Sequence, residues 1–328
     1  MINKMVKLNS LIKYSSVILI SFLNFYVMYL IHYDNFWILL DASFDVLTGT
    51  PHWRSHQSRL LGPLLLRILF PFGKYYEHTT AIIYVLGFTC FNNLLFYYLL
   101  NKISTKNNMA LKILILFNII FLISQDVWLF AWDFVEITFF VAYGYIIITK
   151  EYIKFLPLIT FVHIFNRESS LLMILFFVYY FYSNYSKENT KTVVFLIFNF
   201  FFGIGYMILS RNFLFIQQGD YLDGGQDLEN TFLGGNWITP VYNLNTLFLK
   251  GGYVEKFIII CSLIILFYYF LKNYKVFDVT EKYLVQVSLV LTLPIFVFGI
   301  FTETRQYFPT IVIFTYLIYI RKLKKIKN

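Results

Sequence analysis

The polar segment that follows the first apolar run of this chain carries residue types suited to acid-base catalysis and anion binding. Asp41 and Asp45 are four residues apart, so on a helix they would share one face. In such a pair, one carboxyl can have a raised pKa and act as a base while the other stays ionised. Arg54, His56 and Arg59 follow in the same segment. We interpret Asp41 and Asp45 as candidate catalytic residues, against the alternative of two solvated surface acids.

A second acidic cluster stands at the start of the apolar run 133–149. Asp133 and Glu136 are three residues apart and would face the same way on a helix. Asp126 comes earlier, where it would cap that helix or contact solvent. Asp126 and Asp133 are therefore candidate substrate-binding residues, with a structural role for Asp126 as the alternative.

The sequence Asn166-Arg167-Glu168 interrupts an apolar stretch that runs from 155 to 182, and it predicts two short helices joined at the outer surface. Non-helical backbone at membrane depth is tolerated where it lines a cavity or is buried in protein, so Arg167 and Glu168 are candidate site residues. A pair between Arg167 and Glu168 that satisfies itself is the alternative. We interpret the nearby His163 as a packing residue rather than a ligand.

Two further polar segments lie toward the C-terminus. Glu303 and Arg305 occupy a polar turn between two apolar runs. The segment 211–255 combines carboxylates and glycines with Trp237, a composition that suits carbohydrate binding, although a solvated connector would have it too. The sequence contains no P-loop, no dinucleotide fingerprint and no His/Cys metal motif. We therefore expect no soluble nucleotide substrate, no nucleic-acid partner and no resident metal site.

Composition indicates that membrane-spanning helices position these residues. Of 328 residues, 59% are hydrophobic, 22% aromatic and only 14% charged. Apolar runs that approach the ~20 residues needed to cross a bilayer recur along the chain. The prediction is an all-α, polytopic transmembrane bundle that forms a single domain over residues 1–328. About ten spans are expected, at 14–32, 79–100, 109–124, 133–149, 155–165, 169–182, 193–210, 256–272, 284–301 and 306–320.

The segment 60–72 is apolar but short, and it contains Arg67 and two prolines. A span there would move four lysines to the non-cytoplasmic side, namely Lys102, Lys106, Lys150 and Lys154. We therefore predict that 60–72 is an interfacial amphipathic helix within a first outer loop at 33–78. The second large outer loop is expected at 211–255.

This topology divides the two basic residue types unequally. Cytoplasmic loops are enriched in Lys and Arg, which places both termini inside. On this assignment 17 of the 20 lysines are inside, whereas six of the seven arginines are outside. Arg can bind phosphate or carboxylate through two parallel hydrogen bonds, which Lys cannot do, so an anionic ligand at the outer face would explain the division. Pairing of these arginines with the acidic loops around them is an alternative of equal weight.

The order of these features over residues 14–182 resembles the GT-C superfamily of polytopic glycosyltransferases, which use sugars carried on polyprenyl phosphate. In that family an acidic residue after the first helix is followed by a Gly, a basic residue and a Pro-Leu run along the membrane. The matching residues here are Asp41 to Asp45, Gly49, Arg59 and Gly62-Pro63-Leu64-Leu65-Leu66. Asp126 or Asp133, followed by Arg167-Glu168, matches the family's middle helix and its broken apolar pair.

The resemblance implies transfer of a sugar from a polyprenyl-phosphate carrier to a glycan or lipid acceptor, with inversion at the sugar carbon. Asp41 or Asp45 would be the catalytic base. The donor phosphate would be bound by arginines, namely Arg54, Arg59, Arg167 and Arg305. Substrate contacts would come from Asp126, Asp133, Glu168, Glu303, His56 and Trp237. A divalent cation such as Mg²⁺ or Mn²⁺ is compatible with this chemistry, but the sequence does not require one.

Two other functions stay open at this point. The arrangement also looks like that of O-antigen and capsule polymerases, in which outer arginines would hold a lipid pyrophosphate. A lipid-linked sugar flippase is the third hypothesis, although transporters usually place ionisable residues near the bilayer midplane. The composition, rich in Phe, Tyr, Ile, Asn and Lys, is typical of an AT-rich bacterial genome. We therefore expect a multi-pass protein of the bacterial cytoplasmic membrane, in contact with membrane lipid and with an extracytoplasmic active site.

Overall fold

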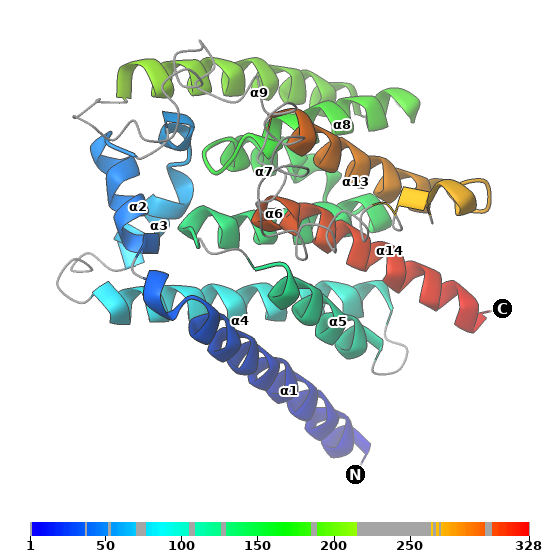
Figure 1. Ribbon diagram of the computed structural model, residues 1–328. Helices are drawn as coiled ribbons and strands as arrows, with labels where there is room; N and C mark the ends of the chain where they lie inside the picture. The colour runs from blue at the N-terminus through cyan, green and yellow to red at the C-terminus, as the bar shows by residue number, and fades with distance from the viewer. Residues whose placement is uncertain are drawn as a thin grey trace.

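The computed structural model describes residues 2–36, 38–51, 54–69, 77–104, 109–125, 129–184, 189–214, 264, 267–268, 270–298 and 304–327, and every regular element in these ranges is helical (Figure 1). The α-helices are α1 (Ile2–Ile31), α2 (Ile38–Thr48), α3 (Leu61–Leu69), α4 (Glu77–Ile103), α5 (Met109–Ile123), α6 (Ala131–Thr149), α7 (Leu156–Ile164), α8 (Ser169–Ser183), α9 (Thr190–Leu209), α13 (Val279–Phe298) and α14 (Phe308–Lys327). Short 3-10 or π turns join several of them, namely η1 (Tyr33–Asn35), η2 (Arg54–Ser58), η4 (Ile153–Phe155), η6 (Ser210–Leu214) and η7 (Thr304–Tyr307).

Four of the described helical segments are long and apolar enough to cross a membrane, namely Leu11–Ile31, His78–Ile103, Ala131–Thr149 and Thr190–Leu214. Helices α1 and α9 also expose large apolar side chains along their outer faces, such as Leu19, Leu23, Phe198 and Phe201. Contiguous exposed apolar surface of this kind marks contact with lipid or with another protein. The all-α prediction is therefore confirmed for the described residues, and the helices have the character of transmembrane helices.

Other parts of the predicted topology stay predictions. The expected span at 256–272 falls largely outside the described residues, and the count of ten spans depends on it. Helix α3 coincides with the expected helix at 60–72, but no membrane surface is present against which to place it.

Helix α6 forms the centre of the bundle and is buried almost all around. It packs against α4 on one side and against α14 on another (Figure 1). The hydroxyl of Tyr316 on α14 donates to the carbonyl oxygen of Val141 at 2.9 Å, and its ring lies over Gly144, where any larger side chain would collide with it. The second half of α6 is consequently held in a fixed place against α14.

Buried amide side chains join α1, α4 and α5. Asn93 donates to the side-chain oxygens of Ser21 at 3.0 Å and of Asn118 at 3.1 Å, and Asn24 also donates to Asn118. Such interhelical hydrogen bonds satisfy polar groups that lipid cannot, and they contribute about 0.6 kcal/mol each in membrane proteins. These contacts fix α1 against the rest of the bundle.

The long helices run side by side, so that functional segments collect at one end of the bundle. Helices α2 and α3 lie at that end, whereas the two termini lie at the other (Figure 1). The starts of α6, α8 and α14 and the ends of α7 and α9 share the α2–α3 end (Figure 1). Polar residues from five distant parts of the chain are therefore brought to one place.

Candidate functional site

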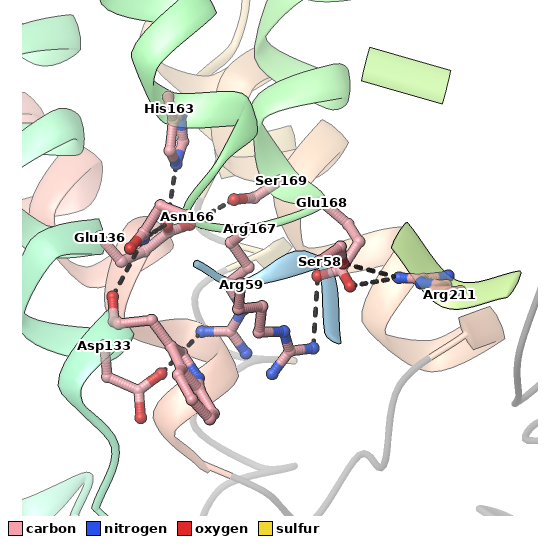
Figure 2. A network of polar contacts seen from close by, with 11 residues as sticks. Ser58, Arg59, Asp133, Glu136, His163, Asn166, Arg167, Glu168, Ser169 and Arg211 are labelled. Carbon is pink, nitrogen blue, oxygen red and sulfur yellow. Dashed lines mark hydrogen bonds and ion pairs between the residues drawn. The ribbon is translucent and has the colours of Figure 1, made fainter. Parts of the chain in front are cut away.

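The candidate site begins at the first turn of α6, which presents a buried carboxylate. Asp133 accepts a hydrogen bond from Arg167 Nη1 at 3.0 Å, and both side chains are at most one-tenth exposed (Figure 2). A helix N-terminus carries a partial positive charge, so it favours an acidic residue at this position. Arg167 comes from the break between α7 and α8, and this ion pair therefore joins that break to α6.

Glu168 lies next to Arg167, and it binds two other arginines. Its Oε2 lies 3.3 Å from Arg59 Nη2 and its Oε1 lies 2.5 Å from Arg211 Nη2 (Figure 2). Burial alone would raise the pKa of this carboxyl, but the charges of Arg59 and Arg211 outweigh that effect and lower the pKa to about 2. Glu168 is therefore ionised at every physiological pH, and it holds η2, α8 and η6 together.

Glu136 forms a second buried centre one turn into α6. Its carboxylate accepts hydrogen bonds from His163 Nε2 at 2.8 Å, Asn166 Nδ2 at 2.9 Å and the hydroxyl of Ser169 (Figure 2). The other ring nitrogen of His163 is 3.0 Å from the hydroxyl of Tyr143. His163 is thus fully buried and bonded at both nitrogens, as expected for a packing residue.

An aromatic layer lies beside the charged groups. The rings of Phe130 and Trp132 are stacked at 4.6 Å, and the ring of His56 approaches that of Trp132 at 5.1 Å. The guanidinium of Arg305 lies 4.3 Å from the ring centre of Phe130, and that of Arg59 lies 5.5 Å from the ring centre of Trp132. Cation-π contacts of this kind hold guanidinium groups flat and leave their edges for other partners.

Among the buried polar atoms of this cluster, four have no hydrogen-bond partner among the described residues and belong to residues already named, namely Arg59 Nε, Trp132 Nε1, Asp133 Oδ2 and Asn166 Oδ1. Buried polar atoms in folded proteins are almost always bonded, so exceptions that gather at one site indicate water, an ion or a ligand. Two of these atoms are donors and two are acceptors. A ligand with both oxygen acceptors and hydroxyl donors would suit them.

The structure brings six of the predicted site residues together, namely His56, Arg59, Asp133, Arg167, Glu168 and Arg305. Asp41 and Asp45 lie on α2, as expected for residues that share a helical face, with Asp41 exposed and Asp45 half-buried. Helix α2 packs through Val46 against Phe130 and Trp132, so it is the apolar face of this helix that lies against the aromatic layer. The side chain of Arg54, together with Asp126, Trp237 and Glu303, is outside the described residues.

Sequence reasoning left several members of the network out of its site residues. Arg211, Glu136, Asn166, Ser58 and Ser169 all belong to it; Ser58 Oγ lies 3.4 Å from Arg211 Nη2. A signal existed for the first two, because Arg211 is one of the six outer arginines and Glu136 shares a helical face with Asp133. No pattern in the sequence pointed to Ser58.

No three His, Cys, Asp or Glu side chains in the described ranges lie close enough together to hold a metal ion. The divalent cation considered from the sequence therefore stays a prediction, with Asp41 as its expected ligand.

Fold and site together define a helical protein with several helices of membrane-spanning character and a buried network of arginines and carboxylates at one end of its bundle. A scan against models of protein families and searches of curated proteins and of solved structures find no match for this chain. The resemblance to GT-C glycosyltransferases therefore rests on the sequence pattern alone.

Proposed function

We propose that this protein is an integral membrane glycosyltransferase that moves a sugar from a polyprenyl-phosphate carrier to a cell-surface glycan or lipid acceptor. The observation that carries the proposal is the gathering of Arg59, Arg167, Arg211 and Arg305 at one end of the bundle. Three of these guanidinium groups are held by the carboxylates of Asp133 and Glu168, and the fourth lies against the ring of Phe130. In the proposed function, the phosphate of the donor binds at this group of arginines.

The proposed reaction is a single displacement at the anomeric carbon. Asp41 or Asp45 takes the proton from the acceptor hydroxyl as its oxygen forms a bond to that carbon. The bond from the carbon to the phosphate oxygen breaks, and the phosphate leaves with the electron pair. Fixed guanidinium groups stabilise the negative charge that develops on the leaving group, an effect that is commonly the largest contribution to enzymatic rate enhancement. One displacement inverts the configuration of the sugar carbon.

The proposed location is the bacterial cytoplasmic membrane, with both termini in the cytoplasm and the active site on the outer side. Charge supports this orientation, because the C-terminal end of α14 carries several lysines and the opposite end carries the arginines. A polyprenyl phosphate keeps its phosphate at the membrane surface, where the network of α3, α6 and α8 would meet it.

Transfer of a labelled sugar from polyprenyl phosphate in isolated membranes tests the proposal. We expect Asp41→Asn or Asp45→Asn, and separately Arg167→Gln, to lower transfer by a factor of about 100 or more while the protein is still expressed. Two exposed residues at the same end provide matched controls, Asp34→Asn for the carboxylates and Arg67→Gln for the arginine, and both should keep near-normal transfer. Undiminished transfer by both aspartate variants would remove α2 from the mechanism.

The surface glycan of a deletion strain separates this activity from polymerisation and from lipid flipping. Loss of one branch sugar, with the ladder of chain lengths preserved, is the result expected for a single transfer. Loss of the length ladder itself would indicate a polymerase and would contradict the proposal. Accumulation of the lipid-linked sugar on the cytoplasmic side would indicate a flippase and would contradict it equally.

A further inference from the structure

The contacts of Glu136 cover both sides of the break between α7 and α8. His163 lies at the end of α7, Asn166 within the break and Ser169 at the first residue of α8, and all three donate to the one carboxylate (Figure 2). Asn166 Nδ2 also donates to the carbonyl oxygen of Trp132 at 3.0 Å. Glu136 therefore connects the break to the first turns of α6.

Arg167 and Glu168 lie between these contacts, and their side chains point to different partners. Arg167 reaches Asp133 on α6, whereas Glu168 reaches Arg59 and Arg211 (Figure 2). The positions of both side chains depend on the backbone conformation of residues 166 to 168, because a rotation of this backbone would move both side chains away from their partners. Backbone hydrogen bonds also hold the break: the amides of Asn166 and Arg167 donate to the carbonyl oxygen of His163, and the amides of Leu61, Ser170 and Leu171 donate to the carbonyl oxygens of Phe165, Arg167 and Glu168. The contacts of Glu136 add side-chain bonds to this backbone.

Glu136 is suited to hold this backbone because it is charged, central and completely buried. Burial of an ionised carboxylate away from water costs free energy unless several hydrogen-bond donors surround it. Loss of any of the three donors, or of the carboxylate, would therefore destabilise the contacts that remain. The bond between His163 and Tyr143 fixes the imidazole from its other side at 3.0 Å. A neutral amide could not accept from all three donors at once, because its nitrogen is a donor.

We propose that Glu136 is a positioning residue that fixes the break between α7 and α8, so that Arg167 is presented to the anionic group of the substrate and Glu168 holds Arg59 and Arg211 beside it. Glu136 itself does not contact the substrate but acts through Arg167 and Glu168. The inference rests on the proposed function for the identity of the substrate, but the positioning can be measured without any transfer reaction.

Hydrogen exchange on the purified full-length protein in detergent measures the positioning directly. In Glu136→Gln, the amides of residues 164 to 170 should exchange about tenfold faster or more, because local opening becomes easier, while those of residues 175 to 182 in the same helix α8 keep their rate. Ser169→Ala removes one donor without stranding a charge, and it should give a smaller change at the same amides. Unchanged exchange at 164 to 170 in both variants would overturn the proposal.

A double-mutant cycle on transfer activity tests whether Glu136 acts through Arg167. In the double variant, the factors by which Glu136→Gln and Arg167→Lys each lower the activity should not multiply, because each change removes the same guanidinium group from its position. Thr138→Val is the matched control, because Thr138 lies on α6 two residues beyond Glu136 and bonds Asn92 rather than the break. The factor of activity lost in Thr138→Val should multiply with the factor lost in Arg167→Lys. If the factors for Glu136→Gln and Arg167→Lys also multiply, the proposal is overturned.

The two measurements separate the two proposals. Faster exchange at the break together with absence of any transfer by the wild-type protein would reject the glycosyltransferase and keep the positioning role of Glu136. The opposite result is equally clear. If exchange at residues 164 to 170 is the same in the wild type and in Glu136→Gln, and transfer by both proteins is lost when Arg167 is replaced, the glycosyltransferase is kept and the positioning role of Glu136 is rejected.

Discussion

At the scale of single residues, the arginines of the site depend on buried carboxylates for their position. Arg59 is 12% exposed and its partner Glu168 is 32% exposed, so this pair is only partly accessible to solvent. Removing one member of a largely buried pair strands the other, which costs more than the pair itself contributes. The network is therefore sensitive to single substitutions.

Replacement of Arg59 tests this dependence. We expect Arg59→Gln to lower the free energy of unfolding by about 2 kcal/mol, less than for a fully buried pair because Glu168 is partly solvated and keeps Arg211. Thermal unfolding of the detergent-solubilised protein provides the measurement. The control is Arg67→Gln on the exposed face of α3, which should change stability by less than about 0.5 kcal/mol. Equal stability of the two variants would contradict a structural role for the Arg59 ion pair.

The pKa of Glu168 predicts a pH dependence with a definite sign. Its pKa is lowered from an ordinary value of 4.5 to about 2, so folding is stabilised by its charge above about pH 4.5. That stabilisation is lost as the pH falls from 4.5 toward 2, because the unfolded chain binds the proton first. Unfolding temperatures measured between pH 6 and pH 2.5 should fall more steeply for the wild type than for Glu168→Gln. Parallel curves would show that Glu168 is not ionised in the way its partners indicate.

At the scale of elements, the approach of α3 to α6 depends on Gly62. A Cβ atom at this position would lie 2.6 Å from the backbone nitrogen of Trp132 and 2.7 Å from its Cα. Backbone atoms cannot move aside as a side-chain end can, so α3 would have to shift. The amide of Leu61 also donates to the carbonyl oxygen of Phe165 at 2.8 Å, which ties α3 to the end of α7.

We accordingly expect Gly62→Ala to destabilise the protein by about 1–3 kcal/mol through overpacking and to reduce transfer, since Arg59 lies two residues before the start of α3. Unfolding temperature and transfer in membranes provide the two measurements. Gly87→Ala is the matched control, because nothing lies within 4 Å of its added Cβ on α4. That variant should be neutral or gain up to about 1 kcal/mol from helix propensity. A loss of stability at Gly87 equal to that at Gly62 would contradict the argument from close packing.

The elements themselves were largely predictable from local pattern. The break at Asn166 to Glu168 appears where the sequence placed it, because polar interruptions of apolar stretches are local signals. Helix α2, which carries Asp41 and Asp45, lies in the segment 33–78 that the sequence assigned to a loop, and no helix was predicted at its position. Helix α4 begins at Glu77 rather than at 79, a small difference, whereas α1 begins at Ile2 rather than at 14 and α14 ends at Lys327 rather than at 320. Helix α3 occupies part of the segment 60–72, and its exposed residues include Arg67, Leu64 and Ile68, while its place at a membrane interface stays a prediction.

At the scale of the whole molecule, the two ends of the bundle differ in charge and in contacts. The end near the termini is closed by ion pairs between α13 and α14, in which Lys324 binds Asp278 and, at 3.1 Å, Glu281. Asp278 and Glu281 also bond each other's backbone amides at 2.8 Å, a capping box that fixes the start of α13. The arginine network closes the opposite end.

Labelling of single cysteines from outside the cell tests the orientation. In a background with Cys90 and Cys261 replaced, a membrane-impermeant maleimide should modify cysteines at positions 34 and 67 in intact cells. Cysteines at positions 275 and 325 should react only after permeabilisation, because they lie at the end that carries the termini (Figure 1). Reaction of positions 34 and 275 from the same side would contradict the bundle's orientation across the membrane.

The sequence by itself determined that this chain is helical and apolar enough for a membrane, and it singled out most of the ionisable residues that meet at one end. Only the tertiary structure decided how they pair. Arg59 meets Glu168 across 109 positions of sequence, and Arg211 meets the same carboxylate across 43. Such pairings follow from how distant helices pack, through contacts such as Gly62 on Trp132, and local periodicity carries no record of them. In the same way, the sequence shows only that Glu136 shares a helical face with Asp133, whereas the packing of distant segments gives its carboxylate three hydrogen-bond donors.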